Sequence, residues 1–141
     1  MKPKSAPFQL TSHLIRNTEL KIRDGFMNKK LKSDFDIDPS YEIFEVDKAY
    51  KSKLKLDIKF NLKSGRKIYI GFKTEIIGTF LSPKKVGKDD FISYLQYSGT
   101  PILIQIVRSF LMSITSQAGL VPPVVIPMIN ITKLYDKTEN G

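Results

Sequence analysis

Hydrophobic and polar residues alternate strictly over residues 53–63, KLKLDIKFNLK. This period of two predicts an antiparallel strand with one face in the core and the other in water. Ser64-Gly65 then supplies turn residues, and residues 67–83, KIYIGFKTEIIGTFLSP, resume the alternation. The two runs together predict a β-hairpin. The apolar positions of the first run are Leu54, Leu56, Ile58, Phe60 and Leu62.

The end of the second run departs from simple alternation. Apolar residues occupy both parities there, and Gly78 interrupts them. The pattern indicates either a β-bulge at Gly78 or a strand that is covered on both faces. The residues concerned are Ile76, Ile77, Phe80 and Leu81.

Two further strands are predicted upstream of the hairpin. Residues 8–22 place apolar side chains at even positions, which predicts one long or bent strand. Residues 41–46, YEIFEV, indicate another strand with a possible bulge, and residues 25–34 are interpreted as a polar connection. The even-numbered apolar residues are Phe8, Leu10, Leu14, Leu20 and Ile22.

The period changes after residue 88. Residues 88–90, KDD, open a short helical turn with acidic residues at its amino end. Thr100 as a cap and Pro101 in the first turn predict the start of a long helix, which Gly119 ends. Residues 130–137, NITKLYDK, predict a short capped helix. Strands first and helices last indicate one α+β domain over residues 1–141, with helices on one face of an antiparallel sheet.

Composition narrows the chemistry. Lys and Arg outnumber Asp and Glu by 23 to 14, so the formal charge is +9, which permits an acidic or polyanionic partner. Cysteine is absent and His13 is the single histidine, which leaves little for zinc or for a nucleophile. Because no phosphate-binding glycine loop or nucleophile elbow occurs, we expect neither an enzyme nor a cofactor.

The acidic stretch at residues 34–45, DFDIDPSYEIFE, resembles a calcium loop in the spacing of its carboxylates. Pro39 stands where that loop needs glycine, so we interpret the stretch as an acidic turn leading into a strand and expect no metal. No apolar run follows the first lysines, and polar residues and prolines interrupt the most apolar window, residues 101–129. We therefore expect a soluble, cytoplasmic protein without membrane insertion.

Lysines on the solvent face of the predicted hairpin offer an alternative function, nucleic-acid binding. RNA-binding sheets usually add exposed aromatic residues that stack on bases, and only Tyr69 is obviously placed on the lysine side. A solvated strand face is therefore favoured over a nucleic-acid site. The lysines of the alternative are Lys53, Lys55, Lys59 and Lys73.

The most unusual stretch is the proline segment, residues 120–129, LVPPVVIPMI. It is almost wholly apolar, yet Pro122, Pro123 and Pro127 exclude a central strand and a helix interior. One interpretation is a core-packing loop between two helices. The other is a rigid apolar wall of a peptide-binding groove, because prolines reduce the entropy lost on ordering.

Residues 99–135, GTPILIQIVRSFLMSITSQAGLVPPVVIPMINITKLY, resemble the carboxy-terminal end of the SecB export-chaperone family. That family carries a proline-led helix with an arginine, a glycine, an apolar proline-containing loop, and Pro-x-x-Asn before a short helix. Gly78-Thr79-Phe80 is similar to the Gly-x-Phe that ends the family's last strand. The matching residues are Pro101, Arg108, Gly119, Pro122, Pro127, Asn130, Leu134 and Tyr135.

The resemblance implies a four-stranded antiparallel sheet with a long C-terminal helix packed on one face, and a homo-oligomer, either dimer or tetramer. It implies an ATP-independent holdase chaperone for unfolded polypeptide, either a protein-export client or the antitoxin of a toxin–antitoxin pair. The implied groove consists of Ile77, Phe80, Leu81, Leu120, Val121, Pro122, Val124, Val125, Ile126, Met128 and Ile129. The implied oligomer interface consists of the helix residues Gln105, Arg108, Met112 and Ser113.

The charge of this chain departs from the family's pattern. SecB proteins that deliver clients to SecA are typically acidic on the outward sheet face, whereas Lys73 falls where one such carboxylate would be. Reversed charge opposes the same docking, which disfavours SecA as a partner. The basic face fits a toxin–antitoxin-associated member at least as well as a general export factor.

Overall fold

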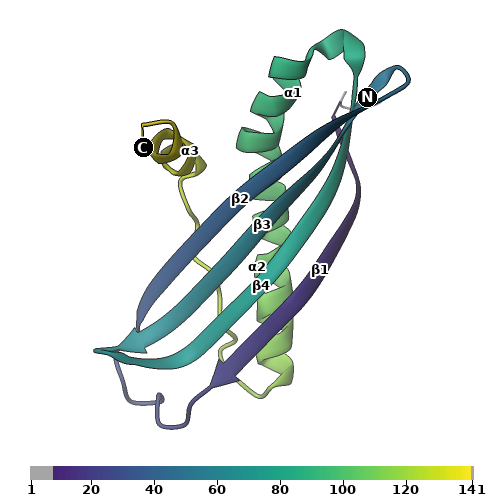
Figure 1. The fold of residues 1–141 in the computed structure, drawn as a ribbon. Coiled ribbons are helices and arrows are strands. Elements are labelled where there is room, and N and C mark those ends of the chain that lie inside the picture. The colour runs from purple at the N-terminus through teal and green to yellow at the C-terminus, as the bar shows by residue number, and fades with distance from the viewer. Residues whose placement is uncertain (1–7, 141) are drawn as a thin grey trace, which may run out of the picture.

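The computed structural model describes residues 8–140, with side chains described as far as Tyr135. It contains one sheet with the strand order β1-β4-β3-β2, in which every pairing is antiparallel. A long helix crosses one face of that sheet (Figure 1). The elements are β1 (Gln9–Ile22), β2 (Lys32–Val46), β3 (Ala49–Ser64), β4 (Lys67–Pro83), η1 (Lys84–Val86), α1 (Lys88–Tyr94), η2 (Leu95–Gly99), α2 (Thr100–Gln117) and α3 (Ile131–Asn140).

The predicted α+β architecture is confirmed. The β3–β4 hairpin turns at Gly65-Arg66, one residue later than the Ser64-Gly65 of the sequence prediction, and Gly65 has the positive φ of 63° that such a turn favours. The alternate apolar residues of β3 all face the helix, and Leu54, Leu56, Ile58 and Phe60 are almost completely buried. No helix among the described residues is long and apolar enough to cross a membrane.

The acidic stretch at residues 34–45 belongs to a strand, so its interpretation as a turn is wrong. β2 begins at Lys32, and Asp34, Asp36 and Asp38 point away from the core because Ile37 between them is buried. Pro39 lies within β2 opposite Leu56. A proline is tolerated there because β2 is an edge strand with one side free of a partner strand.

Two register shifts in β1 break the even-numbered pattern, one between Leu10 and Ser12 and one between Arg16 and Glu19. After the first shift, Ile15 pairs with Ile76 on the core face. Leu14 consequently lies on the outer face and is 55% exposed, contrary to its prediction as an inward residue.

Gly78 marks the closest approach of helix and sheet, and no bulge lies there. Its pairing with Leu54 continues the register without a shift. A Cβ atom at Gly78 would lie 2.7 Å from Cδ2 of the fully buried Leu103. The glycine therefore leaves room for α2 to pack on β4.

The helix is continuous from Lys88 to Gln117, whereas the sequence predicted two helices with a new start at Thr100. Gly99 has helical dihedrals, φ −65° and ψ −44°, and η2 is a π-helical turn that precedes Pro101. Thr100 does not act as a cap, since its hydroxyl donates to the Leu95 carbonyl at 3.1 Å. A π-turn is one of the ways in which a helix accommodates a local irregularity.

The predicted end of the helix is confirmed. Gly119 has a φ of 98°, and the N–H of Leu120 donates to the Thr115 carbonyl at 3.0 Å. This bond and the left-handed glycine form the common glycine-terminated helix end. The last helix, α3, is capped by Asn130, whose side-chain oxygen accepts from the Lys133 N–H at 3.4 Å.

Candidate polypeptide-binding groove

The proline segment lies alongside α2 on the helix-covered side of the sheet (Figure 1). Its side chains divide into two groups. Val124 and Ile126 are buried in the core, with exposed fractions of 7% and 0%. Val121 and Met128 are 89% and 88% exposed. The segment is therefore attached to the core by one side and presents apolar side chains on the other.

The buried hydroxyl of Thr115 joins the middle of the segment to α2. The Thr115 Oγ1 donates to the Leu111 carbonyl at 2.8 Å and accepts from the backbone N–H of Val124 at 3.0 Å. Val124 lies outside any strand, so no neighbouring strand accepts a hydrogen bond from its N–H. The Thr115 hydroxyl accepts that bond instead. The apolar segment is thereby held in place without a backbone ladder.

An apolar depression of 370 Å³ lies at the end of the sheet near the β3–β4 turn. Three parts of the chain that are distant in sequence form it: the connection between β1 and β2, the core-facing residues of the hairpin, and the first half of the proline segment. Its lining residues are Phe26, Met27, Leu31, Leu62, Ile70, Leu120, Val121, Pro122, Pro123, Val124 and Val125.

A second space, the helix cleft, has a volume of 170 Å³ and lies between α2 and the second half of the proline segment. Its walls are apolar except for Gln105 and Arg108. The remaining lining residues are Pro101, Ile104, Pro127, Met128, Ile129 and Ile131.

Seven of the eleven predicted groove residues line one or the other of these two spaces. Leu120, Val121, Pro122, Val124 and Val125 line the depression, and Met128 and Ile129 line the helix cleft. Phe80 and Ile126 are fully buried and line neither space. Ile77 and Leu81 lie on the outer face of the sheet, because they have the opposite parity to Phe80 along β4.

Sequence reasoning missed the contribution of the β1–β2 connection. Phe26 and Met27 form part of the depression, and Met27 is 80% exposed. The available signal was three apolar residues, Phe26, Met27 and Leu31, inside a stretch that was interpreted as a polar connection. Gly25 has a φ of 91°, which turns the chain at that point.

The residues predicted for the oligomer interface lie on α2. Gln105, Met112 and Ser113 are exposed, and Arg108 is half-buried. Nη1 of Arg108 donates to the Gln105 side-chain oxygen at 3.5 Å, while its Nε has no hydrogen-bond partner among the described residues. Their role in assembly stays a prediction.

The outer face of the sheet carries the lysines of the nucleic-acid alternative. Lys53, Lys59 and Lys73 are exposed, but Asp36 pairs in register with Lys59 and Glu42 with Lys53. Carboxylates of β2 therefore lie opposite lysines of β3 and interrupt the basic surface. A nucleic-acid backbone requires a continuous basic surface.

One carboxylate organises the centre of this outer face. Glu75 accepts from Arg16 Nε and from Asn17 Nδ2, both at 2.8 Å, and Lys55 Nζ lies 3.3 Å from it. Hydrogen bonding from Arg16, supported by Asn17 and Lys55, lowers the pKa of Glu75 to about 2. Lys55 is thus engaged with Glu75, and with Asp57 at 3.7 Å, and is not available to a phosphate.

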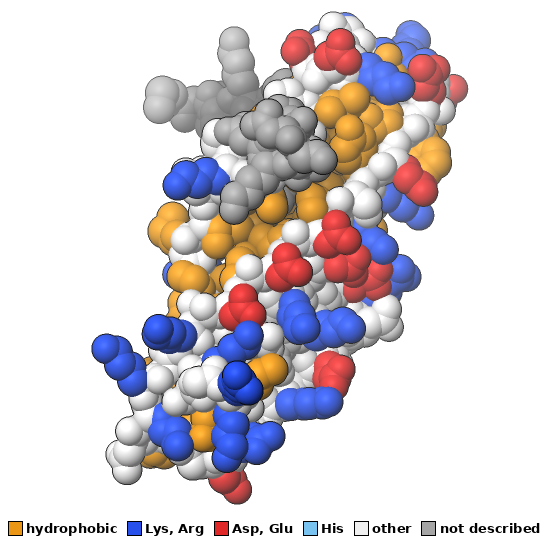
Figure 2. Space-filling view, turned by 60° about the vertical axis from the view of Figure 1, so that its left-hand side comes forward, with side chains coloured by type: hydrophobic (Ala, Val, Ile, Leu, Met, Phe, Trp, Pro, Cys, Tyr) orange, Lys and Arg blue, Asp and Glu red, His pale blue; other side chains and the backbone are white. Residues whose placement is uncertain are grey.

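Figure 2 shows hydrophobic side chains gathered over the upper part of the molecule and Lys and Arg side chains toward the lower end. Acidic side chains border the apolar strip. The apolar and charged surfaces are therefore adjacent but separate. Among the described residues, no cluster of His, Cys, Asp and Glu has the arrangement of a metal site.

No protein-family model matches the chain, and no curated protein matches it. Among solved structures, the chain is similar to the Mycobacterium tuberculosis SecB-like chaperone Rv1957 in complex with a ChAD peptide from the Rv1956 HigA1 antitoxin. The TM-score is 0.65 at 14% identity, over 87% of this chain and 91% of that one. The chain has a SecB-like fold.

A second similar structure is a protein of unknown function from Streptococcus agalactiae, with a TM-score of 0.54 and 13% identity over 86% of this chain and 97% of that one. Both matches cover most of this chain and most of the matched chain. The expected four-stranded sheet with its long helix on one face is confirmed.

Proposed function

We propose that this protein is a non-catalytic, ATP-independent holdase chaperone that binds unfolded polypeptide along the proline segment. The observation that carries the proposal is the division of this segment into a buried side, with Ile126, and an exposed apolar side, with Val121 and Met128. Exposed apolar residues on a preformed wall bind polypeptides of many sequences. The SecB-like fold supports the same function, since the similar mycobacterial protein is a chaperone in complex with a peptide.

The client class that we favour is an antitoxin-like segment rather than an export precursor. The peptide in the similar mycobacterial structure comes from an antitoxin. A formal charge of +9 also suits a client or a second partner with acidic character.

The protein's own assembly, as a dimer or tetramer through the exposed residues of α2, is part of the proposal. The mass of the free protein in solution measures this assembly.

The test is suppression of aggregation of an unfolded model protein without ATP. A double variant with Val121→Asp and Met128→Asp should need about five- to tenfold more protein for half-maximal protection, because it places charges in the contact surface. Both side chains are largely exposed, so the free energy of unfolding should change by less than about 1 kcal/mol.

Leu14→Asp provides the matched control, since Leu14 is a 55% exposed apolar residue on the opposite sheet face. The control should protect the model protein as well as the unmodified chain does. Equal protection by all three proteins, or protection only in the presence of ATP, would reject the proposed function.

A further inference from the structure

A cavity of 530 Å³ lies on the outer face of the sheet near the β3–β4 turn, on the opposite side from the proline segment. Its floor is Gly71, which lies between Asn61 of β3 and Lys21 of β1 in the strand register. A Cβ atom at Gly71 would lie 3.4 Å from Asn61 Oδ1, so any longer side chain there would extend into the cavity. We call this space the basic cavity, and its lining residues are Glu19, Lys21, Ile22, Arg23, Lys59, Asn61, Ile68, Tyr69, Gly71, Phe72 and Lys73.

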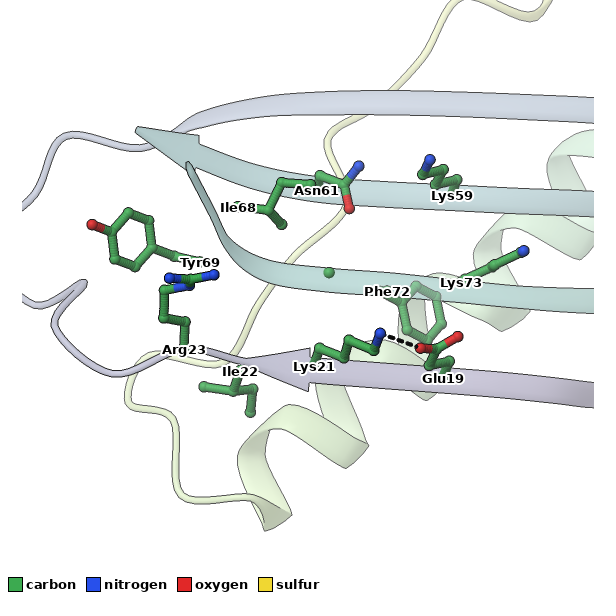
Figure 3. A pocket seen from close by; sticks show the side chains of 11 residues that line it. Glu19, Lys21, Ile22, Arg23, Lys59, Asn61, Ile68, Tyr69, Phe72 and Lys73 are labelled. Atoms are coloured by element: carbon green, nitrogen blue, oxygen red, sulfur yellow. Dashed lines mark ion pairs between the residues drawn. The ribbon is translucent and has the colours of Figure 1, made fainter. Parts of the chain in front are cut away.

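Two lysines of this lining oppose each other. Lys59 and Lys73 are directly paired across β3 and β4. Like charges directly opposite in a sheet are destabilising. Glu19 is the register neighbour of Lys73, but its carboxylate forms an ion pair with Lys21 Nζ at 2.9 Å, as Figure 3 shows.

Lys59 has Asp36 and Lys73 has Glu19 as a register neighbour, but no direct ion pair is formed with either carboxylate. Neither lysine, nor Arg23, has an ion pair within 4.0 Å in the part of the chain that the structure describes. A negative group placed above Lys59 and Lys73 would remove their mutual repulsion.

Tyr69 shows that the positive field extends to the turn. The Lys29 amine lies 5.4 Å from the centre of its ring. Hydrogen bonding from Lys29 lowers the pKa of Tyr69, and the charges of Lys67 and Arg23 act in the same direction.

Apolar surface lies directly beside these cations. Ile22 and Ile68 line the basic cavity and are 39% and 42% exposed. A ligand with both a carboxylate and an apolar side chain would therefore contact more of the cavity than a simple anion does.

The surroundings favour a compact ligand over an extended polyanion. Asp34, Asp36 and Asp38 follow one another on the outer face of β2, next to the β3 lysines. Lys55, farther along β3, already contacts Glu75. A nucleic-acid backbone that left the basic cavity would meet carboxylates at the next strand, and the repulsion would oppose binding.

We propose that the basic cavity is a docking site for an acidic segment of a partner protein. Carboxylates of that segment bind Lys59, Lys73 and Arg23, and an apolar side chain packs between Ile22 and Ile68. The site is separate from the proline segment, so a partner can bind here while a client occupies the opposite face.

The experiment measures binding of a short fluorescent peptide of alternating Glu and Leu to the full chain, by anisotropy. The double variant Lys59→Gln with Lys73→Gln should raise the Kd at least about tenfold, because two charge contacts are lost. Lys53→Gln is the matched control on the same strand and face, outside the cavity, and should change the Kd less than about twofold. Gly71→Val keeps every charge but fills the floor, and it should also weaken binding.

Equal binding of a peptide with Gln in place of Glu would overturn the proposal, and so would equal weakening by Lys53→Gln. If single-stranded DNA binds more tightly than the peptide, and if substitution of Lys53 or Lys55 also weakens DNA binding, the partner is a nucleic acid and not an acidic segment. Suppression of aggregation should be unchanged in the Lys59 and Lys73 double variant, so failure of this proposal is distinguishable from failure of the proposed chaperone function.

Discussion

The helix-covered face of the sheet and its outer face are formed by alternating residues of the same strands, yet different interactions stabilise them. On the first face, Leu56, Phe72 and Phe80 are almost inaccessible and pack beneath the long helix. On the second, Glu75 gathers Arg16 and Lys55 around one carboxylate. The comparison indicates that substitutions on the first face act through packing, whereas those on the second act through charge and depend on pH.

The comparison is tested most strongly at Gly78, where helix and sheet are closest. Gly78→Ala should lower the free energy of unfolding by about 1 to 3 kcal/mol, because the new methyl group would overlap the buried Leu103 side chain. Denaturant unfolding measures the change.

Gly71→Ala is the matched control on the same strand but the outer face. Its nearest neighbour would be Asn61 Oδ1 at 3.4 Å, so the change in stability should be less than about 1 kcal/mol. If both variants unfold at the same denaturant concentration, the close approach at Gly78 does not limit packing.

A smaller effect is expected at the junction between α2 and the proline segment. Thr115→Val removes the hydroxyl that accepts from the Val124 N–H and leaves that buried donor without a partner. The expected cost is about 1 to 2 kcal/mol, and hydrogen exchange of the Val124 amide should become faster. Thr115→Ser retains the hydroxyl and should restore slow exchange; equally fast exchange in both variants would contradict the anchoring role.

The smallest effect is expected on the outer face, as a dependence on pH. The pKa of Glu75 is lowered from 4.5 to about 2, so its stabilising contribution is complete above pH 4.5 and is lost as the pH falls to about 2. The stability difference between the unmodified chain and Glu75→Gln should therefore shrink over this interval.

Removal of Arg16 provides the control for this titration. In an Arg16→Gln background the pH dependence caused by Glu75 should be weaker, because Arg16 makes the largest contribution to the lowered pKa. A difference that stays constant from pH 4.5 to 2 in the unmodified background would show that Glu75 is not specifically stabilised as the anion.

The candidate site could be located from the sequence, but the exposure of its side chains could not be predicted. The prolines at 122, 123 and 127 excluded regular structure locally, so the special character of residues 120–129 was visible in the sequence. Which of its side chains are exposed was not visible, because Val124 is held inward by Thr115 and Ile126 by the core. The prediction that Ile77 and Leu81 belong to the same wall was wrong, because their positions along β4 place them on the face opposite to Phe80.

The sequence by itself determined the elements whose causes are local. Strict alternation defined β3, a helical period defined α2, and Gly119 defined its end, since each depends on neighbours a few residues away. The tertiary structure decided which face of β1 turns inward after its register shifts and how η2 joins two predicted helices into one. It also placed Phe26 and Val121 in the lining of one depression and Lys59 opposite Lys73 in the sheet. These features depend on pairing between distant parts of the chain, and no local pattern of hydrophobic and polar residues specifies that pairing.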